Sequence, residues 1–346
     1  MKKTLFIILV VLGCYSCVEK NKDDIEKISI KDFGDVINLD AIKIPVDDSL
    51  FNPYQIKLLD SLLFVLNVNT DNLLKIYNVN NGKIIFEGIP YGGGPGEVIS
   101  ASICPSFNNE NFYLLEKSKN EIWAYNICDF FSDKSILPLS IIKLENQSTK
   151  SEIMSSDLIV SDNLYDPKNK FNFYNYKGEL IQSVGAYLDE NDNLSLQENK
   201  TKYMSSFVTN KRDRIFVCHY LTDLIEVFDN KGLLLSRKQG PDCFFSEVEE
   251  RKFGRYSSVA SKIGSKDAYM LPRDAGNEIF VHYLGTESGP DFPTVYNKLF
   301  VFDWDGKPLR RYQLSDDTPF YEVDPVRRII YGFACDPEYH MVKYNY

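Results

Sequence analysis

The sequence predicts an all-β fold, a six-bladed β-propeller with four-stranded antiparallel blades. Its 22 tyrosines and 23 phenylalanines give an aromatic content of 14%, and these side chains favour strands. Short aromatic-rich strands alternate with glycine-containing turns in units of roughly 40–50 residues, the spacing of propeller blades. The last unit is one strand short, and an unpaired strand near the N-terminus can supply the missing one. A pair of β-sandwiches is the alternative all-β fold, but the repeated turns favour the propeller.

The first unit is an antiparallel meander that leads into a glycine-rich loop. Asn81-Gly82 separates its last two strands. This dipeptide is the strongest short signal for a β-hairpin, because both residues tolerate positive φ. The predicted strands of this unit cover residues 54–59, 62–67, 73–79 and 83–87.

Five further units repeat the pattern of an aromatic-rich strand, a glycine turn and a second strand. The turns of the third, fourth and fifth units fall at Lys177-Gly178, Lys231-Gly232 and Asp305-Gly306. Residues 245–253 are predicted to form a helical insertion between the fourth and fifth units. The predicted strands of the five units cover residues 112–115, 121–127 and 136–144; 158–160, 171–176 and 179–184; 214–219, 224–229 and 233–237; 278–283, 298–304 and 308–313; and 321–323, 328–334 and 340–346.

The N-terminal strand predicts how the ring closes. Residues 36–44 alternate apolar and polar side chains and stop at Pro45, as a strand does. We expect this strand to complete the last blade, which would join the two ends of the ring and remove an exposed sheet edge. The predicted propeller domain therefore covers residues 36–346.

The first residues predict a targeting signal. Met1-Lys2-Lys3 is basic and residues 4–12 are apolar, but a bilayer-spanning helix takes about 20 residues. A small residue before a cysteine resembles the site at which bacterial lipoproteins are cleaved and acylated, and both Cys14 and Cys17 fit. Residues 1–17 are therefore predicted to be a lipoprotein signal peptide cleaved before Cys14 or Cys17. An ordinary cleaved signal peptide is the alternative.

Charge sets two further expectations. Residues 18–35 begin with a charged stretch that has no apolar period, so they are predicted to form a tether. The whole chain has a formal net charge of −10 and no block of lysine or arginine. Because a phosphate backbone would be repelled on average, no nucleic-acid partner is expected.

The sequence predicts no metal site, no cofactor and no catalytic residue. The five cysteines after the signal lack zinc-like spacing. Residues 189–193 start like a calcium loop, but Leu194 and Lys200 stand where glycine and glutamate are needed. The chain has neither the G-x-S-x-G motif of a nucleophilic serine nor the H-E-x-x-H motif of a zinc protease.

The glycine-rich loop carries a family resemblance. Gly92-Gly93-Gly94-Pro95-Gly96-Glu97 looks like the G-x-G-P-G-E motif of TolB-like or NHL-like six-bladed propeller lipoproteins of Bacteroidota. Val323-Asp324-Pro325 followed by Ile329-Ile330-Tyr331-Gly332 is similar to that family's last blade. The resemblance covers the chain from about residue 36 onward. It implies an outer-membrane lipoprotein at the cell surface, held in the membrane by its N-terminal lipid. The acidic stretch after the cysteines resembles the export signal of surface lipoproteins in that phylum.

Two regions supply the expected ligand-binding residues. Gly94, Gly96 and Glu97 are candidates at one mouth of the ring, although a fixed connection between the first two blades is the alternative interpretation of this loop. Arg255 and Arg273 lie between the fourth and fifth units, where a connection could reach the central channel.

These residues and the resemblance predict a non-enzymatic binding or scaffold module for an envelope protein partner or a glycan, because loops on a rigid ring vary freely. The alternative is a propeller hydrolase or lyase that acts on a carbohydrate or lactone through carboxylates in the channel. A convergent charged cluster at one channel mouth, with shifted pKa values, would favour this alternative.

Overall fold

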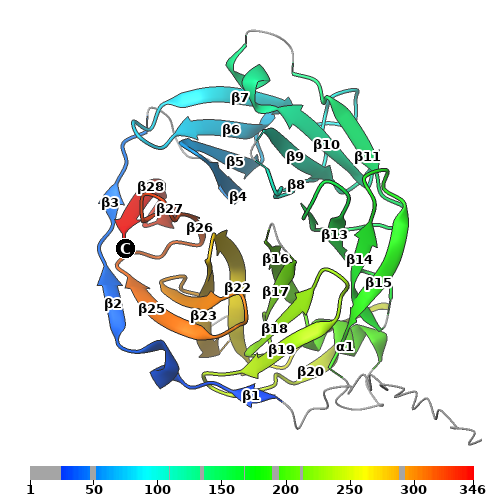
Figure 1. Ribbon diagram of the computed structural model, residues 1–346, viewed down its shortest axis with the longest axis vertical. Helices are drawn as coiled ribbons and strands as arrows, with labels where there is room; N and C mark the ends of the chain where they lie inside the picture. The colour runs from blue at the N-terminus through cyan, green and yellow to red at the C-terminus, as the bar shows by residue number, and fades with distance from the viewer. Residues whose placement is uncertain are drawn as a thin grey trace, which may run out of the picture.

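The computed structural model describes residues 25–46, 52–108, 110–132, 136–166, 168–188, 195–210, 213–287 and 293–346. Six mainly antiparallel sheets are arranged around a central channel, which confirms the predicted six-bladed β-propeller (Figure 1). Cys14, Cys17 and the segment 189–193, which starts like a calcium loop, lie outside the described residues.

Four consecutive strands form each of the first three blades, in order from the channel to the rim. Blade one contains β4 (Asn52–Leu59), β5 (Leu62–Val68), β6 (Asn72–Asn78) and β7 (Ile84–Pro90). Blade two contains β8 (Ala101–Ile103), β9 (Asn111–Glu116), β10 (Glu121–Asn126) and β11 (Ser140–Lys143). Blade three contains β12 (Ser151–Ile153), β13 (Ile159–Asp162), β14 (Asn169–Tyr174) and β15 (Leu180–Ala186).

The other three blades also include strands from the N-terminal segment. Blade four contains β16 (Ser205–Thr209), β17 (Arg214–His219), β18 (Leu224–Asp229), β19 (Leu234–Gln239) and β1 (Glu26–Lys27). Blade five contains β22 (Lys266–Ala275), β23 (Glu278–Glu287), β24 (Lys298–Asp303), β25 (Pro308–Leu314) and β2 (Val36–Leu39). Blade six contains β26 (Phe320–Asp324), β27 (Ile329–Cys335), β28 (Tyr339–Asn345) and β3 (Ile42–Lys43).

The hydrophobic core lies between neighbouring blades. Phe64 of blade one stacks on Phe112 of blade two, with 4.6 Å between ring centroids. Because the second and third strands of a blade are covered on both faces, they read as nearly continuous apolar runs, such as β5 and β17. Such runs are the strands that the sequence predicted most accurately.

The N-terminal segment, residues 25–46, runs along the rim of three blades and is called the N-terminal strap below (Figure 1). Its strands β1 and β2 pair in parallel with β19 and β25, and β3 pairs antiparallel with β28. The last blade is therefore closed by an N-terminal strand, as predicted. The closing strand is β3 alone, because β2 belongs to blade five.

The prediction that residues 18–35 form a tether is wrong for residues 25–35. Ile25, Ile28 and Phe33 are all less than 9% exposed, and Phe33 lies on a short 3₁₀ helix, η2 (Ile30–Phe33). These three side chains reach the blades from a segment whose neighbours are mostly charged, so no apolar period marks it. The folded domain therefore includes residues 25–35 as well as the predicted range from residue 36.

The helix predicted at residues 245–253 is also wrong, although an insertion does lie there. The chain forms a hairpin of β20 (Val248–Phe253) and β21 (Tyr256–Ser261), with the two-residue turn Gly254-Arg255. Gly254 has φ +62, a conformation that suits the first position of a tight hairpin turn. The helix of the described chain that the sequence did not predict is α1 (Leu196–Lys202), which contacts both hairpin strands.

Three further observations concern cysteines, metal-binding groups and membrane-spanning helices. The five cysteines after the signal are free thiols, and Cys104 and Cys218 are buried. Within the described ranges, no three His, Cys, Asp or Glu side chains are grouped so that they could hold a metal ion. The helices of the described chain are all too short or too polar to cross a membrane.

Candidate functional site: the channel pocket

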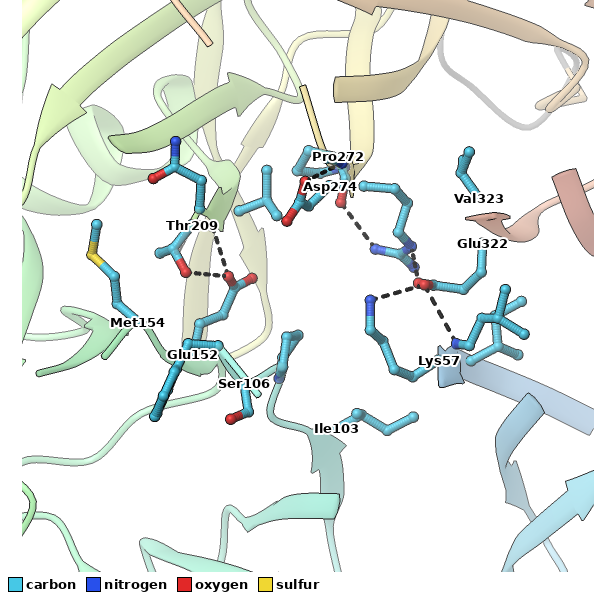
Figure 2. A pocket seen from close by; sticks show the side chains of 18 of the residues that line it. Lys57, Ile103, Ser106, Glu152, Met154, Thr209, Pro272, Asp274, Glu322 and Val323 are labelled. Atoms are coloured by element: carbon cyan, nitrogen blue, oxygen red, sulfur yellow. Dashed lines mark hydrogen bonds and ion pairs between the residues drawn. The ribbon is translucent and has the colours of Figure 1, made fainter. Parts of the chain in front are cut away.

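A cavity of about 260 Å³ lies at the end of the channel where the inner strands of the blades finish; we call it the channel pocket (Figure 2). All six blades contribute to its wall. Three cations and three carboxylates line it, so the formal charge of the lining is zero. These side chains are Lys57, Lys150, Glu152, Arg273, Asp274 and Glu322.

Glu322 joins three blades in the pocket wall. Its carboxylate accepts a hydrogen bond from Lys57 Nζ of blade one at 2.9 Å and pairs with Arg273 Nε of blade five at 2.7 Å. The Glu322 side chain is only 4% exposed, so both contacts are sheltered from water. Removing either cation would leave the carboxylate partly unpaired, which makes this cluster costly to disturb.

Glu152 has the corresponding position between blades three and four. It accepts hydrogen bonds from the backbone N–H of Thr209 at 2.8 Å and from its hydroxyl at 3.1 Å. Lys150 lies 3.3 Å from the other carboxylate oxygen and also donates to the Ser206 hydroxyl and to the Phe207 carbonyl. Burial lowers the pKa of Lys150, and Glu152 opposes that shift. The pair thus fixes blade three to blade four at the channel.

Blades one and two are joined there by an amide. Gln55 accepts a hydrogen bond from Ile103 N at 2.8 Å and donates to the Ile103 carbonyl at 3.3 Å. The Ser102 hydroxyl donates to the same amide oxygen at 3.2 Å. Polar side chains therefore hold neighbouring blades together along the channel.

A backbone distortion places Arg273 in the pocket. The pairing of β22 with β23 shifts between Met270 and Arg273, and Leu271 between them has φ +53. A left-handed conformation costs a residue with a side chain roughly 1–2 kcal/mol. The Tyr321 hydroxyl donates to the Leu271 carbonyl at 2.9 Å, and Arg273 Nε donates to the Tyr321 carbonyl at 3.0 Å. Blade six therefore holds both the distortion and the guanidinium.

The structure does not bring the predicted site residues together. Arg273 reaches the channel, as expected, but from strand β22. Arg255 is exposed at the turn of the β20–β21 hairpin. Gly94, Gly96 and Glu97 belong to the connection from β7 to β8, on the face where inner strands begin, whereas the channel pocket lies where they end.

The contacts of the glycine-rich loop explain its motif. Glu97 turns back and accepts a hydrogen bond from Gly94 N at 2.7 Å. A Cβ on Gly92 would lie 2.1 Å from a Glu97 carboxylate oxygen, and Gly96 has φ +79. Gly92 gives the carboxylate room and Gly96 adopts a left-handed conformation, which supports the interpretation as a fixed connection. A ligand role for Gly94, Gly96 and Glu97 stays a prediction.

Sequence reasoning missed most of the pocket. Lys57, Glu152 and Glu322 are single charged residues in three separate strands, and no spacing relates them. Strands β12 and β16, which carry the blade three and blade four contacts, were not predicted at all.

Comparisons with known proteins agree with this architecture. The family model described as TolB-like 6-blade propeller-like matches residues 32–325. A Bacteroides fragilis protein named for its inferred export is similar in structure, with 13% identity, a TM-score of 0.57 and coverage of 92% of this chain and 98% of its own. A DUF4221 family member from Bacteroides vulgatus has 12% identity, a TM-score of 0.55 and coverage of 88% and 95%. No curated protein matches the chain.

Proposed function

Because this chain belongs to the TolB-like 6-blade propeller-like family, we propose that it is an envelope binding module whose channel pocket takes a neutral glycan. The observation that carries the proposal is the state of the charges in the pocket. Glu322 and Glu152 are each paired with cations or hydrogen-bond donors from neighbouring blades. Charges that neutralise one another favour a ligand with hydroxyl groups over a ligand with a net charge.

The size and lining of the pocket fit this ligand class. Its volume of about 260 Å³ lies just below the range of roughly 300–1,000 Å³ for drug-sized ligands, so a sugar unit or a chain end suits it. Polar side chains such as Ser106 and Thr209 alternate in the wall with apolar ones such as Ile103 and Pro272 (Figure 2). Sugars present both hydroxyl groups and apolar ring faces to such a surface.

The same contacts weigh against the hydrolase or lyase alternative. A general base needs a carboxylate lone pair that can reach the substrate. Glu322 accepts from Lys57 and the Leu58 amide and forms an ion pair with Arg273, and Glu152 accepts from Thr209 twice and forms an ion pair with Lys150. Turnover of a carbohydrate or lactone that is lost in Glu152→Gln and Glu322→Gln would restore this alternative.

Thermal unfolding of the mature chain with a panel of neutral and acidic glycans tests the proposal. A ligand at a hundred times its Kd stabilises the folded state by about 2.7 kcal/mol. We expect a rise in Tm with a neutral glycan and its loss in Ser106→Trp, which fills the pocket. Ser257→Trp on the exposed β21 strand is the matched control and should keep the rise. A response only to acidic glycans, or an equal response in Ser106→Trp, would contradict the proposal.

The envelope location is proposed from the basic and apolar start of the chain and from Cys14 and Cys17. Mass spectrometry of the mature protein from its native host should find an acylated N-terminal cysteine. Cys14→Ser and Cys17→Ser separately identify which cysteine carries the lipid, and protease treatment of intact cells tests surface exposure. A mature N-terminus without lipid would favour an ordinary signal peptide.

A further inference from the structure

A second cavity, of about 350 Å³, lies between the N-terminal strap and blade five, away from the channel; we call it the strap pocket. The strap contributes Ile30 and Val36 to its wall. The remaining wall includes Tyr283, Lys298 and Arg311 from three strands of blade five. Its volume falls within the range of small-molecule sites.

The strand register places the polar side chains of this pocket on one face. Phe300 is paired with Arg311, and Arg311 with Val36 of the strap. Lys298 lies two residues before Phe300 and therefore on the same face, because side chains alternate along a strand. His282 pairs with Leu299 in the antiparallel register, so Tyr283 lies opposite Lys298 on the neighbouring strand. The phenol, the ammonium and the guanidinium thus come from neighbouring positions of one sheet face.

The Tyr283 hydroxyl is the unusual group in this pocket. The residue is 5% exposed, and its hydroxyl forms no hydrogen bond of normal geometry with any described residue. Burial raises the pKa of Tyr283, and the nearby Asp223 and Asp242 raise it further, so the hydroxyl keeps its proton. The ring is fixed by Phe300 and Tyr269, each 4.8 Å away between centroids. Asp242 lies beside this hydroxyl but forms no hydrogen bond of normal geometry with it. Because buried hydroxyls are normally paired, this one can still donate to a better-placed acceptor in the cavity.

The charges of the pocket indicate what the acceptor is. Lys298 Nζ and Arg311 Nε donate to the backbone carbonyls of Leu284 and Gly34, and neither cation forms an ion pair with a carboxylate of the described chain. The one carboxylate in the wall, Asp242, lies 3.5 Å from Lys266. Two cations and one carboxylate leave the lining with a formal charge of +1, which favours an anionic group.

We propose that the strap pocket binds a carboxylate-bearing small ligand. The carboxylate accepts from the Tyr283 hydroxyl and faces Lys298 and Arg311, while the apolar part of the ligand packs on Ile30 and Val36. An acidic sugar and the C-terminal carboxylate of a peptide both offer this chemistry. Because the strap forms one wall, the bound ligand also fixes the strap to blade five.

Paired ligands test the proposal on the mature full-length chain. Glucuronate is compared with glucose, and acetyl-Ala-Ala-Leu with its C-terminal amide, by thermal unfolding and hydrogen exchange. We expect a rise in Tm with at least one carboxylate but not with its neutral partner, and slower exchange in residues 30–36. The responding pair identifies the source of the carboxylate. No response to either carboxylate, or an equal response to a neutral partner, would overturn the proposal.

Two tyrosine variants separate ligand binding from folding. Tyr283→Phe should leave the Tm of the free protein unchanged or higher, because it removes an unpaired buried hydroxyl, and it should lose the carboxylate response. Tyr269→Phe is the matched control: its hydroxyl donates to the Gly240 carbonyl, so the variant should melt lower and keep the response. A response that persists in Tyr283→Phe, or a Tm loss there equal to that of Tyr269→Phe, would contradict the assignment.

Charge and location are tested by two more variants. Arg311→Gln should weaken carboxylate binding at least about tenfold, since a hydrogen bond to a charged group is lost. Ser106→Trp, which fills the channel pocket, should leave the carboxylate response intact. The ligand proposed for the strap pocket and the ligand proposed for the channel pocket can therefore be disproved independently. Undiminished binding in Arg311→Gln would overturn the anionic assignment.

Discussion

Two interfaces between neighbouring blades, called seams below, are each filled by a phenylalanine on a short 3₁₀ helix. The two helices come from different parts of the chain. Phe33 on η2 of the strap packs between blades four and five, with its ring 4.5 Å from that of Phe300. Phe130 on the 3₁₀ helix η3 (Ile127–Phe131) packs between blades one and two, with its ring 4.9 Å from that of Phe86. Both side chains are at most 2% exposed. The space between two blades widens toward the rim, so a large apolar side chain, called a plug below, is needed to fill it. Either a terminal segment or an internal connection can supply this side chain.

The difference between the two plugs is how they are held. η3 connects β10 to β11 within one blade, so it is fixed at both ends by neighbouring strands. η2 belongs to a terminal segment, and short parallel pairs on each side hold it: β1 with two paired residues and β2 with four. A terminal segment can detach while the ring stays folded, which an internal connection cannot do as easily.

The largest effect is expected from Phe130→Ala. Removal of a buried phenylalanine costs about 3–5 kcal/mol, because it leaves a cavity between blades one and two. Urea unfolding measures the loss. Phe131→Ala changes the next residue, which is 57% exposed, and should stay within about 0.5 kcal/mol of the wild type. Equal losses in both variants would show that Phe130 is not a plug.

Phe33→Ala should cost less, about 3 kcal/mol at the low end of the same range, because the strap can leave while the blades persist. Hydrogen exchange distinguishes the two plugs. In Phe33→Ala we expect faster exchange in residues 25–39 and unchanged exchange in blades one to three. A uniform increase across the ring would mean that the strap and the blades unfold as one unit, and the contrast with Phe130 would be lost.

A third seam, between blades five and six, contains a buried polar contact and can be compared with the first two. His282 of blade five lies with Nε2 3.1 Å from the Thr318 carbonyl, which precedes blade six, and burial lowers the pKa of His282 to about 4. Because the unfolded value is near 6.5, the unfolded chain takes up the proton first as the pH falls. The contribution of His282 to the free energy of unfolding is therefore complete above pH 6.5 and falls as the pH drops from 6.5 to 4. Between pH 7 and pH 5 the free energy of unfolding decreases by about 2 kcal/mol.

Urea unfolding at pH 7 and pH 5 tests the histidine. His282→Gln should reduce the difference in unfolding free energy between the two pH values. His340→Gln, near the start of β28, is the control variant. An identical pH dependence in the wild type and His282→Gln would show that the folded ring accepts the proton without loss.

The fold could be predicted because the second and third strands of each blade carry long apolar runs and glycine turns. Among the inner strands, β4 and β26 were predicted but β12 and β16 were not: β12 has only three residues, Ser151–Ile153, and its glutamate accepts hydrogen bonds from another blade. Too few residues are present for a period to appear. Local sequence signals for helix starts are also ambiguous in this chain. Ser195 and Glu198 form a capping box at α1, whereas the same spacing at Ser246 and Glu249 precedes a strand that pairs with β21.

The smallest effect concerns the glycine-rich loop that spans the seam filled by Phe130. Gly96→Ala should cost about 1–2 kcal/mol, since φ +79 strains a residue with a Cβ although the nearest contact, Leu137, is at 3.5 Å. Gly93→Ala is the matched control: its Cβ would meet only Ile99 at 3.7 Å, and its φ is not in the left-handed region, so it should be neutral or stabilising by about 0.5 kcal/mol. Thermal unfolding of the two variants decides whether the motif is retained for its backbone shape. A Gly93→Ala loss as large as that of Gly96→Ala would mean that the loop must also stay free of side chains, as a surface that contacts a partner would require.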